Sequence, residues 1–207
     1  RDAANYGDAG ADTLGHIAQR FQKEGLPFSL PNLTRWGLAH LSPSVASRKP
    51  DTTDACYGVL EPMSMGKDTT TGHWQMVGVI LDKPFPTYPD GFPEEITGAL
   101  ERATGVTYIG NKASSGTVIL EELGERHMRE RAPILYTSAD SVLQIAAHED
   151  IFSIEELYGF CAKAREIGDR YNIGRVIARP FTGPSGTYER TAYRRYYSIE
   201  PPDGLLM

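Results

Sequence analysis

The first third of the chain shows the spacing of hydrophobic residues that is typical of a helix. Four apolar residues between positions 14 and 21 recur at intervals of three or four, which places their side chains on one face of a helix. Asp12 precedes this run as a suitable N-cap, and Gly25 follows it as a stop signal. The pattern therefore predicts a helix from about residue 13 to residue 24.

The next sixty residues have a less regular pattern. It predicts a short helix over 31–36, a loop over 42–54 and a strand over 56–61. A segment of small and polar residues, 64–74, is predicted to be a loop that leads into the apolar run 76–81.

From residue 93 onward, helical and strand patterns alternate. Four prolines and a glycine between residues 84 and 93 indicate a domain boundary just before this region. Residues 188–199 are rich in Tyr and Arg and have the character of an edge strand. The predicted helices cover 93–103, 116–123 and 154–167, and the predicted strands cover 106–109, 134–137 and 175–181. This alternation predicts an α/β domain.

Composition narrows the class of protein. With 207 residues, 40% hydrophobic and 23% charged, the chain can form one large domain or two small ones. No stretch approaches the roughly 20 apolar residues of a membrane span, and the first residues are not a signal peptide, so we expect a cytoplasmic protein without membrane partners. The net charge of -6 argues against general nucleic-acid binding, which needs an excess of basic residues.

Local charge and the reactive residue types add three expectations. Between residues 161 and 207 there are eight basic residues and five acidic ones. This local excess of positive charge indicates either a site for a small anion or a solvated basic surface. Cys56 and Cys161 are expected to be buried, since they are too few and too far apart for a disulfide framework. The five histidines show no metal-ligand spacing and are expected to be structural.

The loop at 64–74 contains the first candidate for chemistry, Thr69. It follows Lys67 and Asp68 at the predicted start of a helix, where backbone N–H groups stabilise an anion. A threonine hydroxyl at this place could accept a phosphoryl group, although it would need a metal ion to lose its proton. The alternative is that residues 68–71 only cap a helix.

Two further groups of polar residues follow predicted strands. Ser138 and Asp140 come after the strand at 134–137, and the carboxyl ends of strands are where α/β proteins bind ligands. These residues could bind a phosphate or sugar hydroxyls, or they could form a simple turn. In the strand at 175–181, residues 175, 177 and 179 share one face, so two arginines flank an apolar residue and could bind an anion or lie at an exposed edge.

The segment Gly66-Lys67-Asp68-Thr69-Thr70-Thr71-Gly72-His73-Trp74 closely resembles phosphopentomutase, an enzyme family of the alkaline phosphatase superfamily. The family interconverts pentose 1-phosphates and 5-phosphates. Four more segments resemble the family in the same order, at 6–18, 109–117, 136–149 and 174–181. Together the matches cover nearly the whole chain.

The resemblance assigns expected roles to individual residues. It implies that Thr69 is phosphorylated and contacts a pair of Mn²⁺ ions, that a bisphosphorylated sugar primes the enzyme, and that a pentose phosphate is the substrate. The residues expected to bind the substrate are Ser138 and Asp140, the phosphate-binding Arg175 and Arg190, and Ile177 in the ribose pocket. Oligomeric state and the preference for ribose or deoxyribose do not follow from it.

The resemblance also divides the chain. It implies an early segment of an alkaline-phosphatase-like core with the nucleophile loop at 1–83, a substrate-binding α/β cap at 84–203 and the start of a return to the core at 204–207. The family's opening strand and its later metal ligands have no counterpart here, so we expect this chain alone not to turn over pentose phosphates. Two alternatives stay open, a non-catalytic sugar-phosphate-binding fragment and another metal-dependent phosphomutase of the superfamily.

Departures from the family pattern are local. Met65 stands where the family has threonine, Thr70 stands where it commonly has methionine, and residues 193–196 replace an Asn-Arg-His-Asp-like run. These differences bear on specificity more than on the class of enzyme.

Overall fold

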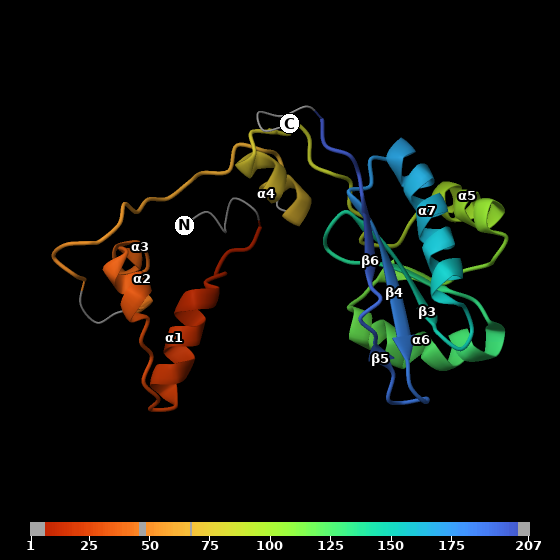
Figure 1. The fold of residues 1–207 in the computed structure, drawn as a ribbon, viewed down its shortest axis with the longest axis horizontal. Coiled ribbons are helices and arrows are strands. Elements are labelled where there is room, and N and C mark those ends of the chain that lie inside the picture. Colours follow the sequence, from red (N-terminus) through yellow and green to blue (C-terminus); the bar gives the residue numbers. More distant parts are fainter. Residues whose placement is uncertain (1–6, 46–48, 67, 203–207) are drawn as a thin grey trace. The chain divides into compact units, whose positions relative to one another are not determined.

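The computed structural model describes residues 7–45, 49–66 and 68–202. The chain forms two compact units, residues 1–62 and residues 63–207 (Figure 1). The predicted boundary at residue 84 lies within the second unit.

The first unit is helical. It contains α1 (Thr13–Lys23), α2 (Pro31–Arg35), α3 (Leu38–Leu41) and a short 3₁₀ helix (Pro43–Val45). Asp12 caps α1 as predicted, because its Oδ1 accepts a hydrogen bond of 2.9 Å from the N–H of Gly15. Among the described residues of this unit, the buried hydrophobic side chains are those of Ala18, Ala39 and Val45.

The predicted strand at 56–61 is wrong. These residues form neither helix nor strand, and the side chains of Val59 and Leu60 are 75% and 93% exposed. A strand needs a neighbour to pair its N–H and C=O groups, and among the described residues this segment has none. Cys56 is also exposed rather than buried, whereas Cys161 is buried as expected.

Within the described residues, the second unit is a mixed six-stranded sheet with four helices. The strands, in the order β1-β2-β3-β4-β5 with β6 also paired to β4, are β1 (Ile109–Ala113), β2 (Ile134–Thr137), β3 (Val142–His148), β4 (Arg175–Thr182), β5 (Glu189–Arg190) and β6 (Arg195–Ser198). The helices are α4 (Thr69–Met76), α5 (Glu94–Thr104), α6 (Gly116–Glu130) and α7 (Ile154–Arg170). The pairs β1·β2 and β3·β4 are parallel, and the other pairs are antiparallel. The predicted α/β class is confirmed.

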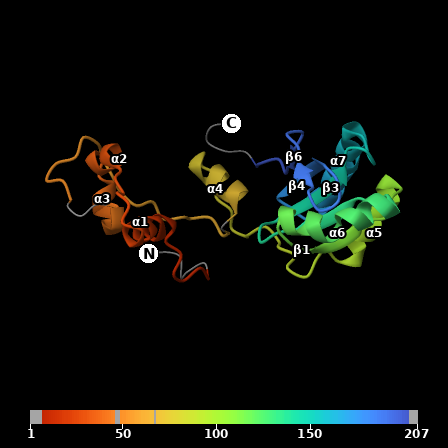
Figure 2. The ribbon, with the colours of Figure 1, turned by 90° about the horizontal axis from the view of Figure 1, so that it is seen from below.

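Helices cover the sheet on both faces (Figure 2). On one face, Leu143 and Ile145 of β3 pack in a core with Leu100 of α5 and Leu157 of α7. On the other face, residues of α6 pack with residues of β2 and β4, including Phe181. β3 is buried along its whole length because it contributes to both cores.

The largest error in the predicted order of elements is the missing β3. Its sequence, Val-Leu-Gln-Ile-Ala-Ala-His, lacks the alternation of apolar and polar residues that marks a strand with one solvated face. β1 begins at Ile109, three residues later than predicted, and has an irregular register at Gly110 to Lys112. Asn111 adopts φ 50° there, and its side chain forms two hydrogen bonds with the backbone of Phe92, at 2.7 and 2.8 Å.

Helix α4 begins at Thr69, inside the predicted loop 64–74, because Asp68 caps a helix there. The remaining elements of this unit follow the prediction. β2 has the predicted bounds, α5 begins and ends one residue later than predicted, and β4 ends one residue later. Helices α6 and α7 extend past their predicted C-terminal ends, to Glu130 and Arg170. The edge segment contains the short strands β5 and β6. No helix of the described residues has the length and hydrophobicity to cross a membrane.

Candidate active site

The turn between β2 and β3 carries two of the predicted substrate-binding residues, Ser138 and Asp140. The turn is held at its start by the hydroxyl of Thr137, which donates to the carbonyl of Val142 at 2.7 Å. Ser141 Oγ accepts from the N–H of Gly174 at 3.1 Å, which ties the turn to the beginning of β4. The turn is therefore fixed beside Arg175.

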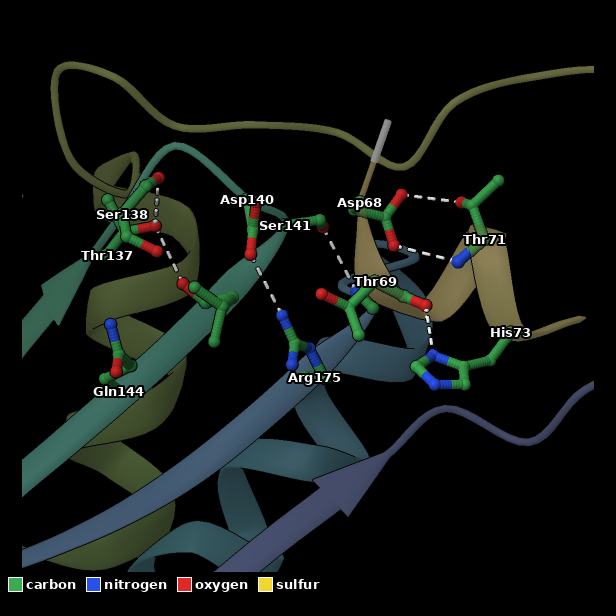
Figure 3. A network of polar contacts seen from close by, with 12 residues as sticks. Asp68, Thr69, Thr71, His73, Thr137, Ser138, Asp140, Ser141, Gln144 and Arg175 are labelled. Atoms are coloured by element: carbon green, nitrogen blue, oxygen red, sulfur yellow. Dashed lines mark hydrogen bonds and ion pairs between the residues drawn. The ribbon is translucent and has the colours of Figure 1, made fainter. Parts of the chain in front are cut away.

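Asp140 and Arg175 form an ion pair. Arg175 Nη2 lies 3.1 Å from Asp140 Oδ2, and Figure 3 shows the two side chains pointing toward each other. The side chain of Arg175 is 17% exposed and that of Asp140 is 42% exposed, so the pair lies at the surface end of the sheet. The structure thus brings together two residues that are 35 positions apart in sequence.

Strand register places the remaining candidates on one face of the sheet. Tyr136 of β2 pairs with Gln144 of β3, Gln144 pairs with Ile177 of β4, and Ile177 pairs with Tyr196 of β6. Directly paired residues share a face, and so do residues two apart along a strand. Arg175 and Arg179 therefore flank Ile177 on the same face, as the predicted strand required.

Arg179 is oriented by a neutral side chain. Its Nε donates to Gln144 Oε1 at 3.0 Å, and Gln144 itself is 4% exposed. Burial lowers the pKa of Arg179, and the positive charges of Arg190 and Arg175 lower it further, while Tyr136 opposes them. Arginine stays protonated despite such shifts, so this guanidinium is a partly desolvated positive charge.

Arg190 of β5 lies on the strand that pairs with the end of β4, opposite Phe181. Its Nη1 and the hydroxyl of Tyr136 each lie 3.1 Å from the position that a Cβ atom on Gly116 would occupy. Gly116 is the first residue of α6, so the arginine, the phenol and the helix N-terminus meet there. A Cβ atom at Gly116 would crowd both polar groups.

Arg194 completes the group of arginines. Its Cζ atom lies 4.2 Å from the centre of the Tyr196 ring, a cation–π contact. Burial lowers the pKa of Arg194, as do the positive charges of three nearby guanidinium groups. Those groups belong to Arg179, Arg175 and Arg190. We call Arg175, Arg179, Arg190 and Arg194 the arginine cluster.

Tyr136 lies in the middle of the arginine cluster. Burial raises the pKa of its hydroxyl, and the charges of three members of the cluster oppose this rise. Those members are Arg179, Arg190 and Arg194. Tyr136 is therefore a neutral hydrogen-bond donor and acceptor at neutral pH.

Thr69 is the first residue of α4. Asp68 is the N-cap, since its Oδ1 accepts from the N–H of Thr71 at 3.0 Å and its Oδ2 accepts from the Thr71 hydroxyl at 2.6 Å. Thr69 is exposed, whereas Thr70 and Thr71 are buried. The carbonyl of Thr69 accepts a hydrogen bond of 2.7 Å from His73 Nδ1 (Figure 3). Lys67, expected beside Thr69, lies outside the described residues.

A pocket of about 210 Å³ joins the Thr69 loop to the substrate turn. It is lined by Gly66 and Asp68 from the loop, by Pro84, Phe85 and Thr87, and by Ala139, Asp140 and Ser141 from the turn. Phe85 is buried and packs edge-on against Trp74 of α4, with 5.6 Å between the ring centres. The residue before Thr69 and the residue paired with Arg175 therefore face the same small space.

The cap of α4 gives a first testable prediction. Replacing Asp68 by Ala removes both hydrogen bonds to Thr71 and should lower the free energy of unfolding by about 0.5–2 kcal/mol. Chemical denaturation of the protein, followed by its tertiary fluorescence, measures this change in the free energy of unfolding. Asp68→Asn keeps an acceptor oxygen for the Thr71 N–H and is the control; equal losses in the two variants would contradict the capping role.

Sequence reasoning did not find several residues of this site. Gln144 was not singled out because it lies in β3, a strand that the sequence pattern did not predict. Tyr136 lies in the predicted strand at 134–137, but its position opposite Gln144 follows only from the pairing of β2 with β3. Arg194 was seen only as part of a basic segment. The expectation that the histidines are structural agrees with His127 and His148, which are buried and hydrogen-bonded. The described residues contain no group of three or more His, Cys, Asp or Glu side chains that could hold a metal.

The sheet face carries four arginines, and the pocket described above is lined by Asp68, the residue before the exposed Thr69. Such a surface is suited to binding phosphorylated small molecules. Comparison with known proteins is more specific. The chain is 50% identical to the phosphopentomutase of Alkaliphilus oremlandii over 208 aligned residues, which cover 100% of this chain and 52% of that protein.

Two further relatives give the same result. The phosphopentomutase of Carboxydothermus hydrogenoformans is 50% identical over 97% of this chain, and that of Dictyoglomus thermophilum is 50% identical over 100% of it. These alignments cover 51% and 52% of the two relatives. No family model matches the chain. The resemblance to phosphopentomutase is confirmed along the chain, which spans about half the length of the curated relatives it matches.

Proposed function

We propose that the protein carrying this chain is a phosphopentomutase, which interconverts ribose or deoxyribose 1-phosphate and 5-phosphate. The similarity to phosphopentomutases supports this proposal over the whole chain. The observation that carries it within the structure is the pocket shared by the Thr69 loop and the Asp140 turn. Asp68, the neighbour of the proposed phosphate acceptor, and Asp140, a proposed ligand of the sugar, both line this pocket.

The proposed reaction passes one phosphoryl group through the enzyme. Phospho-Thr69 transfers its phosphoryl group to the free hydroxyl of the pentose monophosphate, which gives a pentose bisphosphate and the free Thr69 hydroxyl. The Thr69 oxygen then takes the phosphoryl group from the other sugar oxygen, which leaves as a hydroxyl. The sum is an isomerisation with no net consumption of phosphate, and a bisphosphorylated sugar is needed only to load Thr69 at the start.

Side chains of this unit would bind the sugar phosphate during the transfer. The carboxylate of Asp140 accepts hydrogen bonds from sugar hydroxyls, and Ser138 lies on the same turn. Arg175 and Arg190 contact the phosphate that is not transferred, because a guanidinium group matches a phosphate with two parallel hydrogen bonds. Ile177, 3% exposed between Arg175 and Arg179, supplies an apolar wall for the ribose.

The metal belongs to the proposal through the resemblance alone. We propose two Mn²⁺ ions, with Thr69 as the residue of this chain that contacts them; when bound, such ions lower the pKa of a hydroxyl and neutralise charge on phosphate. The described residues offer no group of three carboxylate, imidazole or thiolate ligands, so they do not by themselves fit a metal pair. We also propose an alkaline-phosphatase-like core segment at 1–83 and a substrate cap at 84–203.

The test of the function is a coupled assay. The complete reading frame that encodes this chain is expressed, incubated with ribose 1-phosphate, Mn²⁺ and a bisphosphorylated sugar, and followed for ribose 5-phosphate. We expect conversion in both directions, with phosphate retained in the sugar. Release of inorganic phosphate without isomerisation would instead indicate a phosphatase and overturn the proposal.

A further inference from the structure

The arginine cluster contains more positive charge than its neighbours compensate. Among the ion pairs formed within the described residues, Arg175 is the only member of the cluster that takes part, through Asp140. Arg179, Arg190 and Arg194 have no carboxylate within ion-pair distance in that part of the chain. Three guanidinium groups therefore share one end of the sheet face, and no described carboxylate forms an ion pair with them.

The neutral partner of Arg179 maintains this imbalance. Gln144 is buried and holds Nε of Arg179 at 3.0 Å. An amide oxygen fixes the direction of the guanidinium but adds no negative charge, so the guanidinium keeps its full attraction for an anion. The Nη groups, which are not engaged by this bond, are the donors that a phosphate takes up.

Arg194 is oriented in a comparable way. Its guanidinium lies over the ring of Tyr196, a contact that restrains the plane of the group and leaves the charge uncompensated. Tyr196 pairs with Ile177, so Arg194 contacts a ring that shares a sheet face with the predicted ribose wall. The side chain of the neighbouring Arg195 points to the opposite face of the sheet. Its guanidinium lies 5.0 Å from the centre of the Tyr158 ring and 5.2 Å from the centre of the Tyr197 ring.

The surroundings favour a dianion over a single negative charge. The first residue of the 15-residue helix α6 lies at Arg190 and at the Tyr136 hydroxyl, so a helix N-terminus and a neutral phenol add hydrogen-bond donors to three guanidinium groups. A phosphate monoester carries nearly two negative charges at neutral pH, and three acceptor oxygens that guanidinium pairs can share.

We propose that Arg179 and Arg194 are two further ligands of the substrate's non-reacting phosphate, and that Gln144 is the residue that positions Arg179 for it. This inference rests on the proposed function for the identity of the sugar, but not for the binding of phosphate. It adds two phosphate ligands to Arg175 and Arg190, and it makes a buried glutamine a determinant of anion affinity. Arg175, already paired with Asp140, then contacts the phosphate from the side of the sugar.

The main test replaces the neutral partner of Arg179 by a charged one of the same shape. Gln144→Glu keeps an oxygen at hydrogen-bond distance but compensates the charge of Arg179. We expect Kd for inorganic phosphate and for ribose 5-phosphate to rise about tenfold, the effect of losing roughly 1.4 kcal/mol. Gln22→Glu on the exposed side of α1 makes the same change of charge elsewhere and should leave both Kd values unchanged. Calorimetry on the complete protein measures the affinities.

A second pair of variants tests the role of Arg194 in phosphate binding. Its side chain is exposed, so its replacement should not disturb folding. Arg194→Gln should weaken phosphate binding several-fold, whereas Arg195→Gln, on the opposite face, should not. Unchanged phosphate affinity in both Gln144→Glu and Arg194→Gln, in proteins with the parent's thermal midpoint, would overturn the inference. A parent protein that binds neither inorganic phosphate nor ribose 5-phosphate would also overturn it.

Two readouts separate a positioning role of Gln144 from a general structural one. In turnover of pentose phosphates, Gln144→Glu should raise KM and leave kcat nearly unchanged, because the phosphate it affects does not react. The neutral variant Gln144→Leu should also weaken phosphate binding in the parent protein, and it should have no further effect on Kd in an Arg179→Leu background. An equal further loss there would show that Gln144 does not act through Arg179. If the variants change inorganic phosphate affinity as expected but the protein does not isomerise pentose phosphates, the proposed function fails and the anion site stands.

Discussion

Replacing Thr69 by valine is expected to abolish the phosphoenzyme and to reduce mutase activity roughly 10³-fold or more, because no other hydroxyl of the loop can replace it. Thr69 is exposed at the start of α4. Thr70 is buried, and the Thr71 hydroxyl is buried and donates to Asp68. Mass mapping after incubation of the complete protein with a bisphosphorylated pentose or hexose should find the phosphate on Thr69.

The matched variants make this prediction sharp. Thr69→Ser keeps a hydroxyl at the same place and should retain a phosphoenzyme, although with slower turnover. Thr70→Val, next to it in a buried position, should still be phosphorylated at residue 69. Phosphate found on Thr70 or Thr71 in the parent protein would mean that the nucleophile has been misassigned.

The sequence alone predicted much of the sheet, since several strands carry strong local signals. Residues 134–137 are apolar and bounded by a proline and hydroxyl residues, and β2 has the predicted bounds. β3 was missed because both of its faces are buried, so a central Gln and a terminal His interrupt the apolar run without marking a solvated face. The segment 56–61 is the reverse case: its residues have a strand-like pattern but form no strand, because they lack a pairing partner among the described residues.

The candidate site shows the same division between local and non-local information. The shared face of Arg175, Ile177 and Arg179 follows from the two-residue period of one strand, and the prediction needed nothing else. The pairing of Gln144 with Ile177, and so the contact of Gln144 with Arg179, follows only from the register between two strands. The pocket between the Thr69 loop and the Asp140 turn is lined in part by Phe85, whose role no local pattern indicates.

Arg175 and Arg190 have different neighbours, so their alanine variants should lose affinity for ribose 5-phosphate and inorganic phosphate to different extents. Replacing either residue by alanine should weaken binding of ribose 5-phosphate by about 1.5–3 kcal/mol, the range for hydrogen bonds to charged groups, or roughly 10- to 150-fold in Kd. For Arg190 the loss should be as large with inorganic phosphate, because this arginine has no carboxylate partner among the described residues and lies with Tyr136 at the start of α6.

For Arg175 the loss should be smaller with inorganic phosphate than with ribose 5-phosphate, since the variant also frees the carboxylate of Asp140, which then lacks its ion-pair partner beside the sugar. Arg195→Ala is the control, because the Arg195 guanidinium lies against the rings of Tyr158 and Tyr197 on the opposite face of the sheet. Titration calorimetry of the three variants with both ligands distinguishes the two roles. If Arg175→Ala and Arg190→Ala bind ribose 5-phosphate as tightly as Arg195→Ala, these arginines are surface charges and the substrate site lies elsewhere.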